Sequence, residues 1–148
     1  MSSNLQSRAD QIVSRFQALP DWEAKYKLLI DFGRQAPEIL SEYKTEENKV
    51  RGCQSQVWMR AWLDDQNRLY FEADSDALLV KGLVHILVQV YSNTEPFEIL
   101  QFPPEFLKKL GFDTHLSPSR TNGLHSMLKQ IRNYAIAFQY QINQKKSH

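Results

Sequence analysis

The fold is decided by the stretch VWMRAWLDDQNRLYFEADSDALLVKGLVHILVQVY, residues 57–91. It begins with two runs rich in Val, Trp, Leu, Tyr and Phe, at residues 57–63 and 68–73, separated by the polar residues 64–67. Two such runs around a short polar turn predict a β-hairpin. Because side chains alternate between the two faces of a strand, the first run predicts that one face of the hairpin is more polar than the other.

The rest of this stretch predicts a buried helix. From Ala77 to Tyr91, apolar residues occupy nearly every face, and a helix that is apolar all round lies inside a protein. Asp74 or Ser75 is expected to cap its start, while Asp76 would interact favourably with the positive end of the helix dipole. Two carboxylates at a strand-to-helix junction are more often capping residues than metal ligands, so no metal site is expected here.

Helical patterns lie on both sides of the hairpin. Apolar residues at helical spacing, capping residues and Pro-led starts predict two helices before it and three more after the buried helix. The charged run 44–49 predicts a solvated connector, and residues 144–148 predict a frayed tail. The order of elements favours a segregated α+β fold. The two helices before the hairpin are expected at residues 5–16 and 22–33, the second with Asp21 as its cap and Gly33 at its end. After the buried helix, a short helix is expected to start at 94–96, another to run from 103 to Gly111, and the last to start near Ser117.

Composition limits the class of protein. The chain has 148 residues, with 18 Lys and Arg against 17 Asp and Glu, which fits a single domain over residues 1–148. A net charge of +1 provides no broad basic field, so neither nucleic acid nor a membrane is an expected partner. With one Cys, no secretory signal in residues 1–10 and no apolar run long enough to span a bilayer, we expect a soluble, cytoplasmic protein.

The single cysteine, Cys53, stands in the sequence Arg51, Gly52, Cys53, Gln54, Ser55, just ahead of the first strand. Small and polar neighbours predict a loop, where side chains are free to meet a partner. A free cysteine is more often buried and inert, and a reactive one needs a cation or backbone amides to stabilise its thiolate. The residues alone leave both interpretations open, and none of the four histidines stands at a spacing that indicates a catalytic dyad.

The residues around Cys53 resemble a known family. The stretch ENKVRGCQSQVWMRAW, residues 47–62, strongly resembles the cysteine-loop motif of the SufE family, sulfur-acceptor proteins that work with a cysteine desulfurase. Three further blocks fall in the same order as in that family. They are DWEAKYKLLIDFG at 21–33, DSDALLVKGL at 74–83 and LSPSRTNGL at 116–124.

This resemblance implies a small antiparallel sheet packed against helices, similar to the iron-sulfur scaffold IscU. It implies that Cys53 accepts sulfur, with support from Arg51, Gly52, Gln54 and Ser55, and that Asp76 and Arg120 lie near the loop and its partner surface. On spacing alone, Arg120 is either an exposed charge or an anion anchor.

The implied partner is a SufS- or CsdA-like cysteine desulfurase, and the implied recipient of the sulfur is a SufBCD-like iron-sulfur scaffold. The pyridoxal phosphate belongs to the desulfurase, and no cofactor or metal is expected on this chain, which is not a stand-alone enzyme. Two alternatives remain. The chain could activate the desulfurase allosterically with Cys53 incidental, or act as a thiol redox sensor, which is disfavoured because no second Cys could resolve a sulfenic acid.

Overall fold

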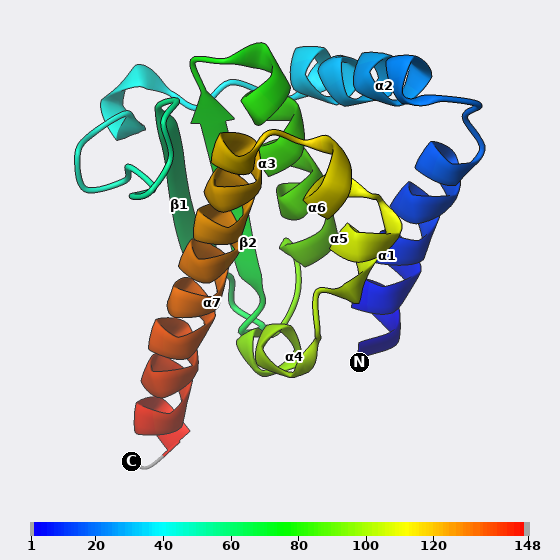
Figure 1. Ribbon diagram of the computed structural model, residues 1–148. Helices are drawn as coiled ribbons and strands as arrows, with labels where there is room; N and C mark the ends of the chain where they lie inside the picture. The colour runs from blue at the N-terminus through cyan, green and yellow to red at the C-terminus, as the bar shows by residue number, and fades with distance from the viewer. Residues whose placement is uncertain (1, 147–148) are drawn as a thin grey trace.

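The computed structural model describes residues 2–146 and has the expected α+β architecture (Figure 1). Its one sheet, among the described residues, is the predicted hairpin, and helices pack around it. The elements are α1 Ser2–Gln17, α2 Trp22–Gln35, a 3₁₀ turn Ser41–Tyr43, β1 Val57–Leu63, β2 Leu69–Ser75, α3 Leu78–Tyr91, α4 Pro96–Gln101, α5 Glu105–Lys109, α6 Phe112–His115 and α7 Pro118–Lys146.

The hairpin is antiparallel, with a register that runs from Val57 opposite Ser75 to Leu63 opposite Leu69. Its inner face is fully buried at Val57 and Met59, as the alternation predicts. The expected polar face is only partly wet, because Trp58 is also buried and the ammonium nitrogen of Lys44 lies 5.3 Å from its ring centroid. The connector before β1 therefore covers part of that face.

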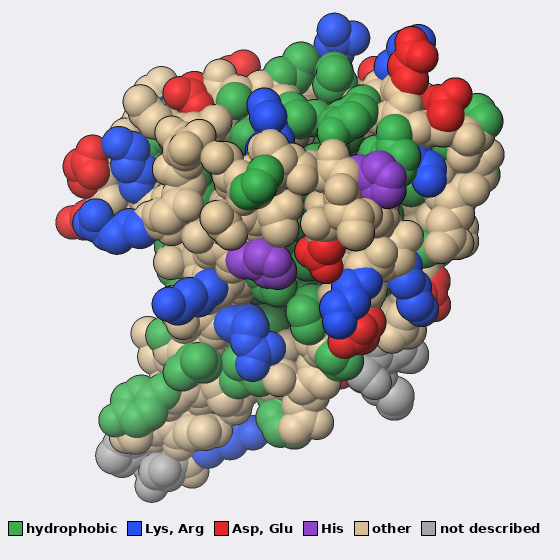
Figure 2. All heavy atoms as spheres, in the orientation of Figure 1, with side chains coloured by type: hydrophobic (Ala, Val, Ile, Leu, Met, Phe, Trp, Pro, Cys, Tyr) green, Lys and Arg blue, Asp and Glu red, His purple; other side chains and the backbone are tan. Residues whose placement is uncertain are grey.

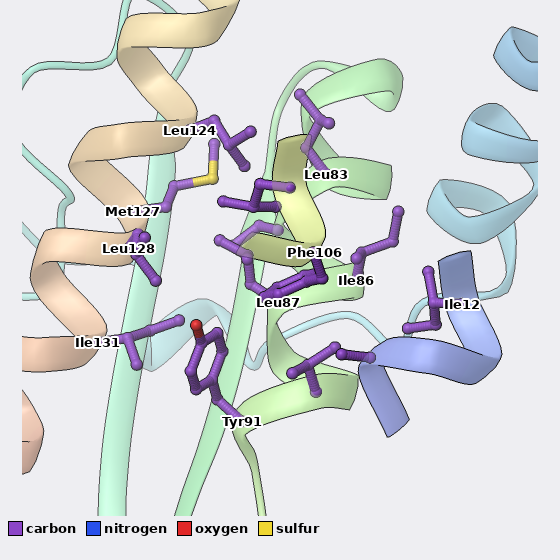
Figure 3. Close-up of a cluster of buried hydrophobic side chains, with 14 of the residues drawn as sticks. Ile12, Leu83, Ile86, Leu87, Tyr91, Phe106, Leu124, Met127, Leu128 and Ile131 are labelled. Atoms are coloured by element: carbon purple, nitrogen blue, oxygen red, sulfur yellow. The ribbon is translucent and has the colours of Figure 1, made fainter. Parts of the chain in front are cut away.

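The helix α3 forms the centre of the core (Figure 3). Its buried side chains meet residues from α1, α5 and α7, and Figure 3 shows Leu87, Tyr91 and Ile131 gathered there. The apolar stripe predicted for the last helix is confirmed, since Leu124 and Ile131 are buried against this core. The two helices that line the site described below are thus fixed by the same apolar cluster.

The helices α2 and α3 touch backbone to backbone. A Cβ atom added to Gly82 would lie 2.1 Å from the carbonyl oxygen of Leu29, and one added to Gly33 would lie 2.5 Å from that of Leu78. The prediction that Gly33 ends the second helix is therefore wrong. That helix continues to Gln35, and Gly33 instead allows its close contact with α3.

The prediction that Asp74 caps α3 is also wrong. The cap position is Ala77, with no side-chain cap, and the Ser75 hydroxyl accepts only the amide of Ala77 itself. The carboxylate of Asp74 is buried and accepts the Ile39 amide at 3.2 Å. It also lies 3.5 Å from the ammonium group of Lys44 and 3.4 Å from that of Lys81, so it ties the connector to α3 instead.

The C-terminal half differs from expectation in two further places. The left-handed Gly111 ends one short helix, as predicted, but it leads directly into an unpredicted one, α6. The last helix runs to Lys146, so the expected fraying from Gln144 is wrong for 144–146, while 147–148 lie outside the described residues. No helix in the described part of the chain is long and apolar enough to cross a membrane.

Candidate functional site

The loop that carries Cys53 is held at its neck. The Val50 amide donates to the Val57 carbonyl at 2.8 Å, which joins the two ends of the loop. The Gln56 amide donates to the Asp76 carboxylate at 3.0 Å, and the Asp76 amide donates back to the Gln56 carbonyl at 3.2 Å. Asp76 thus lies just before the cap residue of α3, and its carboxylate bonds the loop.

Cys53 rests on the N-terminal half of α7. Its thiol donates to the carbonyl oxygen of Gly123 over 3.6 Å, and the side chain is half-buried. The preceding Gly52 has φ +92°, a left-handed conformation that favours glycine. From this turn the sulfur reaches the backbone of α7 and remains partly accessible.

Burial raises the pKa of the Cys53 thiol above its ordinary value. The thiolate is the nucleophile, so the sulfur is a weak nucleophile at neutral pH while the loop is in this position. Activation of the thiol would require a nearby cation or backbone amides, and here burial opposes it. Arg51, the nearest cation in sequence, is exposed.

A pocket of about 180 Å³ opens beside the sulfur. Its apolar floor includes Leu83 and Met127, which Figure 3 shows on α3 and α7. Its polar rim comes from the loop and from the first turns of α7, where Arg120 is exposed. The lining residues are Cys53, Gln54, Ser55, Val80, Leu83, Ser117, Ser119, Arg120, Gly123 and Met127.

The structure brings most of the predicted site residues together. Cys53, Gln54, Ser55 and Arg120 line the pocket, although Arg120 is 67 positions from Cys53 in the chain. The remaining predicted residues are close by. Arg51 and Gly52 border a second hollow of about 310 Å³, which the loop residues 53–55 also line, and Asp76 bonds the neck of the loop.

The parts of α3 and α7 that receive the loop were not predicted from the sequence. Val80 and Leu83 looked like ordinary core residues of an apolar helix. Gly123 could have been singled out, because a glycine inside a helical pattern lowers helix stability and usually has a packing reason. Here the glycine lies directly under the sulfur, and a Cβ atom at this position would make an ordinary contact of 3.6 Å with Cys53 Sγ.

The described histidines lie elsewhere. His85 is half-buried on α3, where burial lowers its pKa, and His115 stacks on Trp22 with ring centroids 4.1 Å apart. His125 is exposed, 3.8 Å from Asp113. None of the three lines the pocket, and within residues 2–146 no group of three or more His, Cys, Asp or Glu is placed to hold a metal ion.

Comparison with known proteins identifies the family. Residues 10–135 match the model of the SufE family, described as an Fe-S metabolism associated domain. SufE-like protein 1, chloroplastic/mitochondrial, of Arabidopsis thaliana is 43% identical over 132 residues, which are 89% of this chain but only 36% of that longer protein. An uncharacterized SufE-like protein of Rhizobium etli is 44% identical over 85% of this chain and 88% of its own length.

The fold has a solved counterpart as well. The solution structure of a hypothetical protein from Thermus thermophilus superposes with a TM-score of 0.74, covering 90% of this chain and 96% of that one. Its sequence identity of 20% supports the fold alone. The family rests instead on the domain match and on the close relatives, and by both the chain belongs to the SufE family.

Proposed function

We propose that this protein accepts sulfur from a pyridoxal phosphate-dependent cysteine desulfurase onto Cys53, stimulates the desulfurase, and passes the sulfur on for iron-sulfur cluster assembly. One observation carries the proposal. Cys53, the only cysteine of the sequence, lines a pocket. Its loop is accessible to a partner, because Gln54 and Gln56, on either side of the pocket-lining Ser55, are exposed. Family membership supports the general role, and the position of Cys53 supports its assignment.

The proposed transfer is an exchange between two sulfur centres. The desulfurase holds the sulfur as a cysteine persulfide, and the Cys53 thiolate attacks the outer sulfur atom of that group. One S–S bond forms as the donor's S–S bond breaks, and the donor cysteine leaves as a thiolate. A SufBCD-like scaffold then takes the sulfur from Cys53 by the same exchange onto a thiolate of its own, so neither transfer needs an external oxidant or reductant.

Transfer requires the loop to open, because attack on a persulfide is in line and needs access. In the closed position the thiol is half-buried and donates to Gly123. We propose that docking of the desulfurase draws the loop out, with Gly52 as the hinge. Leaving the helix removes the burial that raises the pKa of the thiol, so the same movement exposes the sulfur and activates it.

Arg120 is the proposed anion anchor of the site. Its guanidinium borders the pocket that contains the sulfur, and among residues 2–146 it makes no hydrogen bond or ion pair. A guanidinium is charged at every physiological pH, so it can stabilise the departing or arriving thiolate in the docked complex. Arg51 borders the second hollow and is exposed, and we propose that it contacts the partner surface.

A second function is favoured by one observation. In this position of the loop, burial raises the pKa of Cys53 and partly shields its sulfur, and both effects oppose nucleophilic attack. The chain could therefore activate the desulfurase by binding alone, with Cys53 incidental. This alternative predicts that Cys53→Ser raises desulfurase turnover as well as the wild type does.

The deciding experiment is intact-protein mass after incubation with a SufS-like desulfurase and free cysteine, with and without reductant. We expect the wild type to gain one reducible sulfur atom and Cys53→Ser to gain none while keeping the same melting temperature. If Cys53→Ser gains the same sulfur, the acceptor assignment is wrong. If neither protein gains sulfur but both raise turnover, the allosteric function replaces the proposed one.

A further inference from the structure

Two large apolar side chains on α7 are exposed to solvent. Ile136 is 55% exposed and Tyr140 is 64% exposed, and because they lie four positions apart they share one face of the helix. Single exposed apolar residues are ordinary, but a group of them on one face indicates contact with another molecule. Among residues 2–146, the other exposed large hydrophobic residues lie one to a segment, and they are Leu40, Trp62, Leu78 and Phe97.

The same face of α7 is basic on its N-terminal side. Arg132 precedes Ile136 by four positions and Lys129 precedes it by seven, so all of them lie along one line of the helix surface. We call Lys129, Arg132, Ile136 and Tyr140 the α7 stripe. In Figure 2, hydrophobic side chains cover the lower end of α7, and Lys and Arg side chains lie next to them toward the middle of the molecule. The sequence of α7 contains no Asp or Glu, so nothing on the helix neutralises the basic end.

The α7 stripe lies apart from the core and from the Cys53 pocket. The buried residues of α7 fall between the positions of the stripe, as at Ile131 and Ala135, so they point to another side of the helix. The pocket is lined by α7 residues only as far as Met127, nine positions before Ile136. Figure 1 shows the end of α7 extending past the rest of the molecule. A second helix can therefore approach the stripe and leave the pocket open.

The α7 stripe is complementary to itself when two copies of α7 run antiparallel. A twofold axis at Ile136 brings the two Ile136 side chains together. Because Arg132 and Tyr140 each stand four positions from Ile136, the same axis places the guanidinium of each copy over the aromatic ring of the other, which is a cation–π contact.

The basic residues also favour this orientation over a parallel one. In the antiparallel pair the two Arg132 side chains are eight helical positions apart, about 12 Å along the axis, which exceeds the screening length of about 10 Å at 0.1 M salt. Parallel helices would instead place each Arg132 beside its own copy, and each Lys129 likewise. Like charges would then face each other with no acidic side chain of α7 between them.

We propose that this chain forms a weak homodimer through the α7 stripe, with the two α7 helices antiparallel and the two Cys53 pockets facing in opposite directions. The dimer goes beyond the proposed function and does not rest on it, because no residue of the stripe lines the pocket. One pair of helices buries less than the roughly 1,200 Å² of a standard interface, so we expect a dissociation constant on the order of 50 µM.

Sedimentation equilibrium of the full chain tests the dimer, with reductant present so that Cys53 forms no disulfide. Between about 5 and 500 µM, a range that brackets this constant, the mass should rise from one chain toward two. Ile136→Glu places two carboxylates at the axis and should weaken the dimer at least about thirtyfold. Gln141→Glu is the matched control, since it adds the same charge at an exposed position of α7 outside the stripe, and should change the constant less than about twofold.

A double-mutant cycle tests the antiparallel orientation. We expect Arg132→Ala to weaken the dimer about fivefold and Tyr140→Ala about twentyfold, with the double variant also about twentyfold weaker. Independent sites would instead give about a hundredfold. Within one chain these two side chains are two turns apart, so a coupling between them comes from the second copy.

Three results would overturn the proposal. The first is a chain that stays monomeric at the highest concentration, which would show that the stripe does not bind a second copy. The second is equal weakening by Ile136→Glu and Gln141→Glu, which would place the interface elsewhere. The third is a dimer in which the Arg132 and Tyr140 effects multiply, or which Arg132→Ala strengthens, since the helices would then not be antiparallel.

Discussion

The α2–α3 interface and the contact between the Cys53 loop and α7 both contain glycines, but these glycines face different kinds of atom. Gly33 and Gly82 face backbone carbonyls, at 2.5 and 2.1 Å from an added Cβ, and a backbone atom within a helix cannot move alone. Gly52 faces only a serine side chain. The first contact fixes two helices against each other through their backbones, whereas the proposed opening of the second would move a loop and leave α7 in place. A short distance alone therefore does not show whether a contact belongs to the rigid core or to a loop that is proposed to move.

The largest effect is expected from Gly82→Ala. Its methyl group would overlap the Leu29 carbonyl oxygen, so α2 and α3 must move apart. We expect the free energy of unfolding to fall by about 3 kcal/mol, the upper range for overpacking a core. Urea denaturation followed by circular dichroism measures this loss. The matched control is Gly123→Ala, the same substitution inside a helix where an added methyl group has room.

An intermediate effect is expected from Asp76→Ala. The carboxylate accepts the Gln56 amide in an exposed position, and a hydrogen bond of this kind contributes about 1 kcal/mol. Its loss should loosen the loop more than the scaffold, giving about threefold faster alkylation of Cys53 with little change in the global unfolding midpoint. A large fall in that midpoint with unchanged alkylation would show that Asp76 stabilises the folded core and not the loop.

The smallest effect is expected from Gly123→Ala, and its sign is opposite. The added methyl group would contact Cys53 Sγ at 3.6 Å, so the sulfur becomes more buried and its alkylation slows by about twofold. The helix gains up to about 1 kcal/mol because alanine has the higher helix propensity. Faster alkylation would show that there is no room for a methyl group between α7 and Cys53, and that the loop is displaced instead.

The sequence predicts the elements well where the pattern is local. The β-hairpin and the buried helix of residues 57–91 follow from side-chain alternation and from apolar content, and Asp21 caps α2 with a bond of 2.9 Å to the Ala24 amide as expected. It fails where a distant partner decides. Gly33 and Gly111 look alike as helix ends, but α3 lies against the first. Asp74 looks like a cap, yet two of its partners, the Ile39 amide and Lys44, lie more than two dozen residues away.

Only part of the candidate site could be predicted from the sequence. The loop around Cys53 could be recognised from its small polar residues, and its family from the motif GCQSQVW. The proximity of Arg120 followed only from the resemblance, since no periodicity connects the start of α7 with a loop 67 residues earlier. The mixed surface did follow from composition, because basic and acidic side chains are interspersed on the face shown in Figure 2.

The register of the hairpin sets how the molecule can tolerate insertions. At the open end, Val57 pairs with Ser75, directly beside the loop neck and Asp76. One residue inserted into β1 would turn the following side chains to the opposite face and shift the pairing of the strand. The turn at residues 64–67 lies at the other end of the ladder, beyond the Leu63–Leu69 pair. Length variation should therefore be accepted at that turn, whereas a single added residue in the strand would misalign the cysteine loop.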